Sequence, residues 1–387
     1  MKLADRMRLL GTETAFLVLA KAKALEAQGK EIIHLEIGEP DFDTPPNIVE
    51  AAIKALRAGE THYGPAPGIP ALRDAIAKDV AHWRGIEVTR DSVVVTPGAK
   101  PIMFFSIQAL INPGDEVIYP NPGFPIYESV IRFVGATAVP LQLKEERDFC
   151  FDIADLERSL SPKTRLIILN SPQNPTGGVL SKQDLEAVAE LVRGKDIWIL
   201  SDEVYKELIF EGSYSSIASL PGMMNQTIIL DGFSKTYAMT GWRLGYGVMP
   251  PPLAEQITKL AINCHSCTAT FSQYAAIEAL TGPQDEPRKM VNEFNKRREI
   301  IVKGLNQIEG ISCRLPKGAF YVFPNITQLP LSSAQLETYL LEEAGVATLS
   351  GTAFGKFGDG YLRLSCANSI DNIKKALERI EMALKKL

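Results

Sequence analysis

The chain has 387 residues, of which 45% are hydrophobic and 22% are charged, and its formal net charge is -5. The near balance of 41 basic and 46 acidic side chains argues against a nucleic-acid partner, and no apolar stretch approaches the roughly 18 residues of a membrane span. Five cysteines, an odd number, argue against a disulfide framework. We therefore expect a cytoplasmic globular protein that is long enough for two domains.

The first predicted element is a helix near the N-terminus. Residues 15–20 are apolar and resemble the core of a signal peptide, but the stretch is short and Glu13 and Lys21 flank it. An amphipathic helix that ends at Gly29 fits better, because glycine commonly follows the last helical turn.

Four apolar segments in the middle of the chain are predicted to be buried strands, because they are rich in aliphatic and β-branched residues and contain no Gly or Pro. They span residues 92–96, 166–170, 197–202 and 227–231. Helical patterns separate them, at residues 101–111, at residues 182–193 after a Ser181 and Asp184 capping box, and around residues 203–210. This alternation predicts an α/β fold with a parallel sheet.

The last third of the chain has a different pattern. A long charged helix is expected over residues 287–308, short strands near 321–323 and 361–365, and an amphipathic helix over 371–387. Turn-forming residues at Gly282 and Pro283 mark a domain boundary, and a second boundary is expected near residues 43–46. The expected domains are a large one of residues 46–282 and a small one of residues 1–45 and 283–387.

Polar residues follow the predicted strands at the points where the strands end. The strand ending at Asn170 leads into Asn174, the next ends at Asp202 with Tyr205 close behind, and the last leads into Lys235. Because the carboxyl ends of parallel strands meet at one edge of a sheet, where ligands bind, we expect these groups to lie close together.

A site for an anion is predicted at the same edge. Gly98, Ala99 and Lys100 follow the strand of residues 92–96 and precede a helix, so free backbone N–H groups and the positive end of the helix dipole lie there. Arg243 adds a second source of positive charge.

Three blocks of sequence resemble the signature blocks of aspartate-type aminotransferases. They are Asn174-Pro-Thr-Gly177, Ser201-Asp-Glu-Val-Tyr205, and Ser234-Lys235 through Trp242-Arg243, in the same order and at the same spacing. Blocks at residues 38–45, 63–73 and 362–365 are also similar, so the resemblance runs nearly end to end. It implies a fold type I enzyme that depends on pyridoxal phosphate, with a large domain built on a mostly parallel seven-stranded sheet between helices and a smaller α+β domain.

The resemblance also implies roles for residues around the cofactor. Lys235 would carry the cofactor as a Schiff base and shuttle the proton of the substrate α-carbon. Asp202 would pair with the pyridine nitrogen, Tyr205 and Asn174 would bind the phenolic oxygen, and Phe124 would stack on the ring. A helix cap for Asp202 and core packing for Tyr205 and Phe124 are the structural alternatives.

The phosphate end of the cofactor has its own implied set of residues. These are the backbone at Gly98, Ala99 and Lys100, the side chains of Ser234 and Arg243, and Tyr63 from a second subunit, which implies a homodimer. Gly232 departs from the pattern, because many relatives have a serine there that contacts the phosphate.

The substrate side is implied to depend on Arg363. Its two-pronged guanidinium would bind the substrate α-carboxylate, assisted by Gly38 and Asn174. A surface arginine is the alternative, although Arg363 lies within an apolar strand pattern.

The expected function is therefore transfer of an amino group from an L-amino acid, aspartate-type or aromatic, to a 2-oxo acid such as 2-oxoglutarate. A lyase of the same fold, either a C–S β-lyase or an enzyme similar to aminocyclopropane-carboxylate synthase, requires the same residues and stays open. Cys264 and Cys267 have the spacing of a redox motif but no second half-site, so we expect no metal. A dinucleotide-dependent dehydrogenase lacks its glycine-rich fingerprint.

Overall fold

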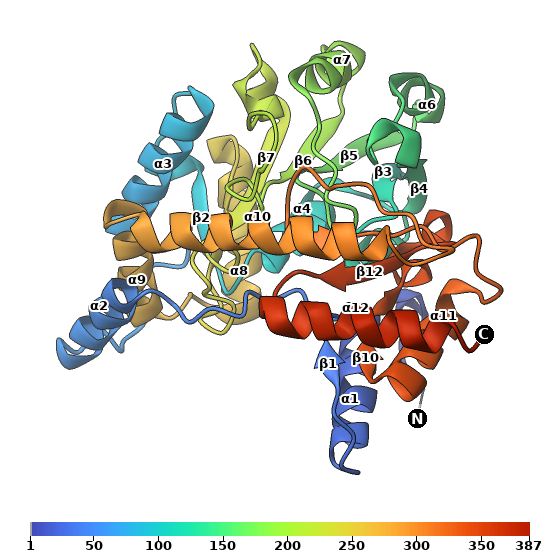
Figure 1. The fold of residues 1–387 in the computed structure, drawn as a ribbon. Coiled ribbons are helices and arrows are strands. Elements are labelled where there is room, and N and C mark those ends of the chain that lie inside the picture. The colour runs from blue at the N-terminus through green and yellow to red at the C-terminus, as the bar shows by residue number, and fades with distance from the viewer. Residues whose placement is uncertain (1) are drawn as a thin grey trace.

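A computed structural model describes residues 2–387 of the chain (Figure 1). Its centre is a seven-stranded sheet with the strand order β2-β8-β7-β6-β5-β3-β4. β8 is antiparallel to both of its neighbours, and the other strands run parallel to one another. The mostly parallel α/β sheet that was expected is therefore confirmed. The strands are β2 (Val93–Thr96), β3 (Glu116–Asn121), β4 (Thr137–Gln142), β5 (Thr164–Asn170), β6 (Trp198–Asp202), β7 (Thr227–Gly232) and β8 (Gly245–Val248).

The four predicted strands are β2, β5, β6 and β7, and helices cover both of their faces. Leu230 packs with the helices of one face and its neighbour Ile229 with those of the other, as strand alternation requires. The first face carries α4 (Lys100–Leu110), α5 (Ile126–Phe133) and α8 (Pro251–His265). The second carries α3 (Pro70–Arg84), α6 (Ile153–Ser159), α7 (Lys182–Val192) and α9 (Thr270–Thr281), with α2 (Pro46–Arg57) packed against α9.

The remaining strands form two small sheets from distant parts of the chain. β1 (Ile33–His34) pairs with β10 (Val346–Ala347), and the second sheet has the order β11-β12-β9. Its strands are β11 (Leu349–Ser350), β12 (Leu362–Ser365) and β9 (Tyr321–Val322). They confirm the short strands expected near residues 321–323 and 361–365.

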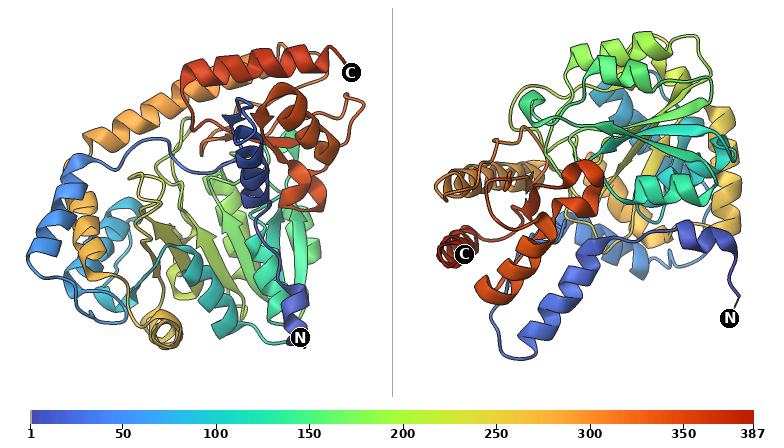
Figure 2. Two further views of the ribbon diagram at one scale, coloured as in Figure 1. Left: turned by 90° about the horizontal axis from the view of Figure 1, so that it is seen from below. Right: turned by 90° about the vertical axis from the view of Figure 1, so that its right-hand side faces the viewer.

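Two long helices lie side by side across this part of the molecule (Figures 1 and 2). They are α10 (Asp285–Leu305) and α12 (Ile370–Leu384), which confirm the expected C-terminal helices within a few residues. α11 (Ser333–Tyr339) contacts α12, where the Tyr339 hydroxyl donates a hydrogen bond of 2.9 Å to the Ala383 carbonyl. Short 3-10 or π turns connect the elements at Asp5–Leu9, Arg90–Ser92, Glu145–Arg147, Ile217–Ser219, Met223–Gln226, Leu340–Ala344, Gly351–Phe354 and Lys356–Gly358.

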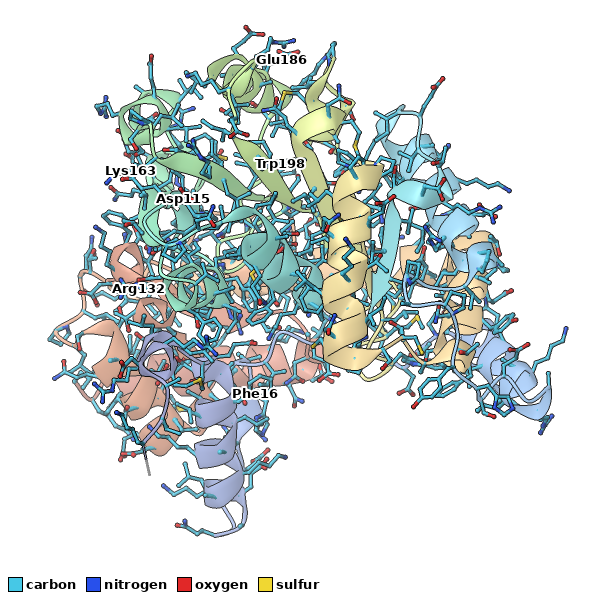
Figure 3. All side chains as sticks on the ribbon, turned by 180° about the vertical axis from the view of Figure 1, so that it is seen from behind. Phe16, Asp115, Arg132, Lys163, Glu186 and Trp198 are labelled. Carbon is cyan, nitrogen blue, oxygen red and sulfur yellow. The ribbon has the colours of Figure 1, made fainter. Side chains whose placement is uncertain are left out.

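The predicted N-terminal helix is α1 (Thr14–Glu26), which protrudes from the body of the molecule. Two of its large apolar side chains are exposed, Phe16 (Figure 3) by 62% and Leu17 by 59%. Val18 and Ala22 are buried, and Ala15 and Leu25 pack against the same core cluster, so one face of α1 packs on the body. The exposed side carries apolar Phe16 and Leu17, unlike the amphipathic helix that was expected. No helix within residues 2–387 is both long and apolar enough to span a membrane.

One predicted helix is wrong. Residues 203–210 form a turn after β6 and not a helix. The backbone of this segment is bound to other parts of the fold, because Glu203 donates its N–H to Leu230 and Phe210 donates its N–H to Lys317. The tertiary bonds therefore replace the helical ones that the local pattern favoured.

Candidate active site

A cavity of about 570 Å³ lies at the carboxyl ends of the central strands. Asn170 at the end of β5, Asp202 at the end of β6 and Gly232 at the end of β7 all line it. Most of the predicted site residues also line it: Gly38, Ala99, Lys100, Phe124, Asn174, Asp202, Tyr205, Ser234, Lys235, Arg243 and Arg363. Two do not line it: Gly98, which precedes Ala99 in the chain, and Tyr63, which is 92% exposed on the surface.

Lys235 is half-buried and provides an amine in this cavity. Its Nζ donates a hydrogen bond of 2.5 Å to the Gly38 carbonyl and lies 5.8 Å from the centre of the Tyr205 ring. Burial, and then the positive charge of Arg363, lower its pKa to about 8. Within residues 2–387 it forms no ion pair, so the amine is available to react with an electrophile.

Asp202 lines the cavity, and its carboxylate accepts hydrogen bonds from groups of the protein. Tyr127 on α5 donates a hydrogen bond of 2.5 Å to Asp202 Oδ2, and the Val204 N–H lies 3.4 Å from Oδ1. Burial raises the pKa of Asp202 to about 6, and the Tyr127 hydrogen bond opposes that rise. A buried carboxylate with this environment is suited to a cationic N–H group.

Two tyrosines meet on the side of the cavity next to Lys235. The hydroxyls of Tyr205 and Tyr321 are 2.8 Å apart, and burial raises the pKa of both phenols. Position 38 must be glycine for this arrangement, because a Cβ there would overlap the Tyr321 hydroxyl. These hydroxyls can donate hydrogen bonds to an oxygen atom in the cavity.

Arg363 on β12 lines the cavity and is buried. Its Nη1 donates a 3.2 Å hydrogen bond to Asn174 Oδ1, and its Nη2 donates to the Glu36 carbonyl. Its Nε is buried without a hydrogen-bond partner, and no carboxylate pairs with it in the described part of the chain. A ligand carboxylate would satisfy this unpaired donor, since a guanidinium binds a carboxylate through two N–H groups.

The N-terminus of α4 and Arg243 form the other end of the cavity. The Arg243 Nη1 donates a hydrogen bond of 2.8 Å to the Thr240 carbonyl, and a Cβ at Gly98 would overlap the guanidinium. A Cβ at Gly245 would overlap the Ala99 backbone, so glycines on two segments let the N-terminus of α4 come this close. The combination of first-turn N–H groups and a guanidinium is suited to a phosphate.

Gly232 closes the same end without a side chain. A Cβ at this position would lie 3.2 Å from Gly245 Cα and 3.3 Å from the Leu244 carbonyl oxygen. A serine there would therefore require β8 to move by a few tenths of an ångström. Ser234 lies on the cavity wall nearby and offers a hydroxyl.

Sequence reasoning missed several residues of the site. Tyr127 and Tyr321 hold Asp202 and Tyr205, and residues 13–16 of the N-terminal segment line the cavity. A strand was expected near residue 321, but nothing local in the sequence shows that its phenol meets Tyr205. The two are 116 residues apart.

Comparisons with known proteins identify the family. Residues 30–380 match the model of aminotransferase class I and II. The chain belongs to this family. This aminotransferase is 41% identical to an aspartate aminotransferase of Pyrococcus horikoshii, over 99% of this chain and 97% of the relative. It is 38% identical to the aromatic-amino-acid aminotransferase 2 of Thermococcus litoralis, over 100% and 99%.

Solved structures agree with the sequence comparison. The crystal structure of the aspartate aminotransferase from Rhizobium meliloti superposes on this aminotransferase with a TM-score of 0.95, at 35% identity and over 100% of each chain. The fold is therefore that of a fold type I aminotransferase, and the protein is an enzyme that transfers amino groups. The family implies pyridoxal phosphate as its cofactor.

Proposed function

We propose that this aminotransferase binds pyridoxal phosphate through Lys235 and moves the amino group of an aspartate-type or aromatic L-amino acid to a 2-oxo acid such as 2-oxoglutarate. One observation carries the proposal. The cavity holds the amine of Lys235, whose pKa is lowered, together with the buried Arg363 guanidinium that lacks a carboxylate partner among residues 2–387. The amine suits a cofactor aldehyde, and the guanidinium suits a substrate carboxylate.

The other side chains of the cavity fit the remaining parts of the cofactor. When bound, it supplies an aldehyde for amines and a ring that withdraws electrons from the substrate α-carbon. Asp202 would hold the ring nitrogen, Tyr205 and Asn174 the phenolic oxygen, and Phe124 would lie against the ring. The phosphate would be held by the backbone at Gly98, Ala99 and Lys100 and by the side chains of Ser234 and Arg243.

The roles of the chain in the reaction follow from its charges. Arg363 orients the substrate by its carboxylate, so that the α-hydrogen lies within reach of Lys235 Nζ. Lys235 then takes the proton from the α-carbon as a neutral amine, which its lowered pKa favours near neutral pH. Asp202 keeps a proton on the ring nitrogen, because the two opposite charges are buried together.

The substrate class rests on the relatives and on the cavity wall. Relatives of nearly full coverage are named for aspartate and for aromatic amino acids. Phe16, Leu349 and Phe354 provide an apolar part of the wall, which suits the ring of an aromatic substrate.

We also propose a homodimer, a cytoplasmic location and the two domains expected from the sequence. The 92% exposure of Tyr63 supports a role in the site of a second subunit, because no part of its own cavity contacts it. The free state of all five cysteines supports a reducing compartment. The strands of the central sheet all fall within residues 46–282, which supports the division into domains of residues 46–282 and of residues 1–45 with 283–387.

The test is a panel of amino acids offered with 2-oxoglutarate to the protein loaded with pyridoxal phosphate. Formation of glutamate with aspartate or an aromatic donor supports the proposal. Release of ammonia and pyruvate without an acceptor identifies a lyase instead. Borohydride reduction followed by digestion should place the cofactor on the peptide with Lys235, and the Lys235→Ala variant is the control that should yield no adduct.

A further inference from the structure

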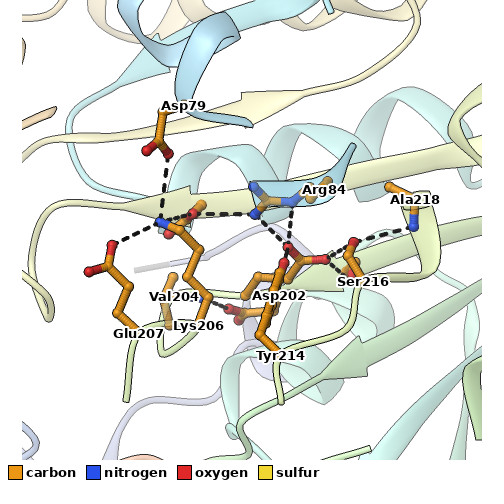
Figure 4. Close-up of polar contacts among 12 residues, drawn as sticks. Asp79, Arg84, Asp202, Val204, Lys206, Glu207, Tyr214, Ser216 and Ala218 are labelled. Atoms are coloured by element: carbon orange, nitrogen blue, oxygen red, sulfur yellow. Dashed lines mark hydrogen bonds and ion pairs between the residues drawn. The ribbon is translucent and has the colours of Figure 1, made fainter. Parts of the chain in front are cut away.

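A buried group of charges lies at the turn that follows β6 (Figure 4), and its members do not line the cavity. Glu203 directly follows Asp202 and is 2% exposed. Its Oε2 accepts hydrogen bonds of 2.9 and 2.5 Å from Nε and Nη2 of Arg84 on α3. Its Oε1 accepts bonds of 2.7 Å from Ser201 and 2.6 Å from Ser216, and the Tyr214 hydroxyl also donates to this carboxylate. Glu203 is therefore fixed by groups from three segments.

Lys206 is a second buried charged residue that directly follows a cavity residue, as Glu203 follows Asp202. It directly follows Tyr205 and is 3% exposed, and its Nζ lies 2.9 Å from Asp231 Oδ2. Asp231, next to Gly232 at the end of β7, also accepts a 3.0 Å bond from Tyr246, and Arg84 Nη2 lies 3.5 Å from it. The charge cluster of Arg84, Glu203, Lys206 and Asp231 thus joins the turn after β6 to the end of β7.

The two segments that this cluster joins, the turn after β6 and the end of β7, also position residues of the cavity. Asp202 and Tyr205 line the cavity from the turn, and Lys235 follows the end of β7 by three residues. The cluster residues are absent from the cavity wall. We propose that Glu203 and Arg84 are positioning residues for the established amino transfer, and that their ion pair holds Asp202 and sets the electrostatic field at the cofactor. This rests on the proposed function of the cavity.

The charges around the turn predict in which direction each substitution should shift the pKa of groups in the cavity. Burial is the main cause of the raised pKa of Asp202, and the negative charges of Asp231 and Glu203 raise this pKa further, so charges of the cluster act on Asp202. Arg84 and Lys206 are the cations of the cluster. Two further acids, Asp79 and Glu207, lie 3.9 and 3.6 Å from Lys206. Burial raises the pKa of Asp79 and of Glu207. Loss of an acid must make the site less favourable for positive charge, and loss of a cation must do the opposite.

The experiment compares Glu203→Gln, Arg84→Gln and the double variant, each loaded with pyridoxal phosphate. The pH midpoint of the visible absorbance band, which reports the proton on the linkage between cofactor and Lys235, is measured for each. We expect a fall of about 0.5 pH unit in Glu203→Gln, a rise of about 0.5 in Arg84→Gln, and a midpoint close to that of wild type in the double variant. Lys206→Gln removes another cation of the cluster and should give a rise as well, so the sign can be tested if Arg84→Gln does not fold.

A purely structural role predicts a different result. It would lower the unfolding temperature of the cofactor-free variants and leave the midpoint unchanged, or move it in one direction in all of them, and either outcome overturns the proposal. Glu278→Gln is the matched control, because this half-buried acid binds Asn47 between α2 and α9 and should leave the midpoint unchanged. If the wild-type chain forms no visible band at all, the proposed function falls, and this inference falls with it.

Discussion

Tyr127 donates a hydrogen bond of 2.5 Å to Asp202, and both side chains are buried, so a helix on one face of the sheet holds the acid that ends a central strand. The tyrosine hydroxyl stabilises the charged form of the carboxylate and opposes the rise that burial causes in its pKa. The acid is thereby kept ionised near neutral pH, as the proposed pairing with a ring nitrogen requires.

Tyr127→Phe should weaken cofactor binding about 10-fold, because a hydrogen bond to a charged group contributes about 1.5 kcal/mol. The pKa of Asp202 should rise further in this variant. The dissociation constant of pyridoxal phosphate is measured by equilibrium dialysis at neutral pH. Tyr119→Phe, which loses a 2.7 Å bond to Glu128, is the control and should bind the cofactor as wild type does. Equal affinity of Tyr127→Phe and wild type would contradict the role given to this bond.

Lys235→Met should stabilise the cofactor-free protein at pH 7 by up to about 3 kcal/mol, since burial lowers the pKa of Lys235 from 10.5 to about 8. The unfolded chain binds more protons than the folded one between these two values. The stability of the wild type should therefore rise from about pH 8 to about pH 10.5, and that of the variant should not follow. Urea unfolding at several pH values measures both, with the exposed Lys182→Met as control. A variant no more stable than wild type at pH 7 would refute the lowered pKa.

Arg363→Lys should reduce kcat/KM about 100-fold, mainly through KM of the amino acid, because an ammonium cannot bind a carboxylate through two parallel N–H groups. The visible band of the bound cofactor should persist, since Arg363 is assigned to the substrate. Steady-state kinetics with a fixed 2-oxo acid test this. Arg314→Lys at an exposed ion pair with Asp148 is the control. A loss of the cofactor band with unchanged KM would reassign the residue.

His34 should make stability depend on pH through its two carboxylate partners. Its Nδ1 lies 2.7 Å from Glu36 and its Nε2 lies 3.0 Å from Glu26, and these contacts, Glu36 first, raise the pKa of His34 above 6.5. The stabilisation is complete below about pH 6.5 and is lost as the pH rises through the raised value. His34→Asn should therefore cost more stability at about pH 5.5 than at about pH 8.5 in urea unfolding. An equal cost at both values would show that the ion pairs contribute nothing.

Tyr63 should act on the cavity of the second subunit. Tyr63→Ala and Lys235→Ala should each have little or no activity alone, and subunits of the two mixed after dissociation should recover about a quarter of wild-type activity, because half of the dimers are hybrids with one intact site. Activity is measured before and after mixing under identical conditions. Mixtures without recovery would place Tyr63 in its own site or outside any site. Mixing Lys235→Ala with Asp202→Asn is the control, since both residues line one cavity and no intact site can form.

The sequence predicts β2, β5, β6 and β7 because these strands are unbroken aliphatic segments with buried residues throughout. β3, β4 and β8 escaped prediction, since Pro120, Pro140 and the glycines 245 and 247 mask them with residues typical of turns. The gathering of Asp202 and Lys235 at one edge follows from parallel topology alone and could be predicted.

Contacts between distant segments could not be predicted in the same way. Tyr127 lies 75 residues from Asp202, and Arg84 lies 119 residues from Glu203. Their meeting depends on which helix covers which face of the sheet, and no local pattern encodes that choice. The helical pattern at residues 203–210 gave a wrong prediction for a similar reason, because the backbone N–H groups of Glu203 and Phe210 bind the distant residues Leu230 and Lys317.

The turn after β6 has a consequence for how the length of this segment can vary. Residues 202 and 205 face the cavity, while residues 203 and 206 belong to the charge cluster. Val204 also lines the cavity, and an inserted or deleted amino acid between positions 202 and 206 would move Tyr205 and Lys206 from their places relative to Asp202 and Glu203. The length of this segment is therefore constrained by both sides of the turn at once.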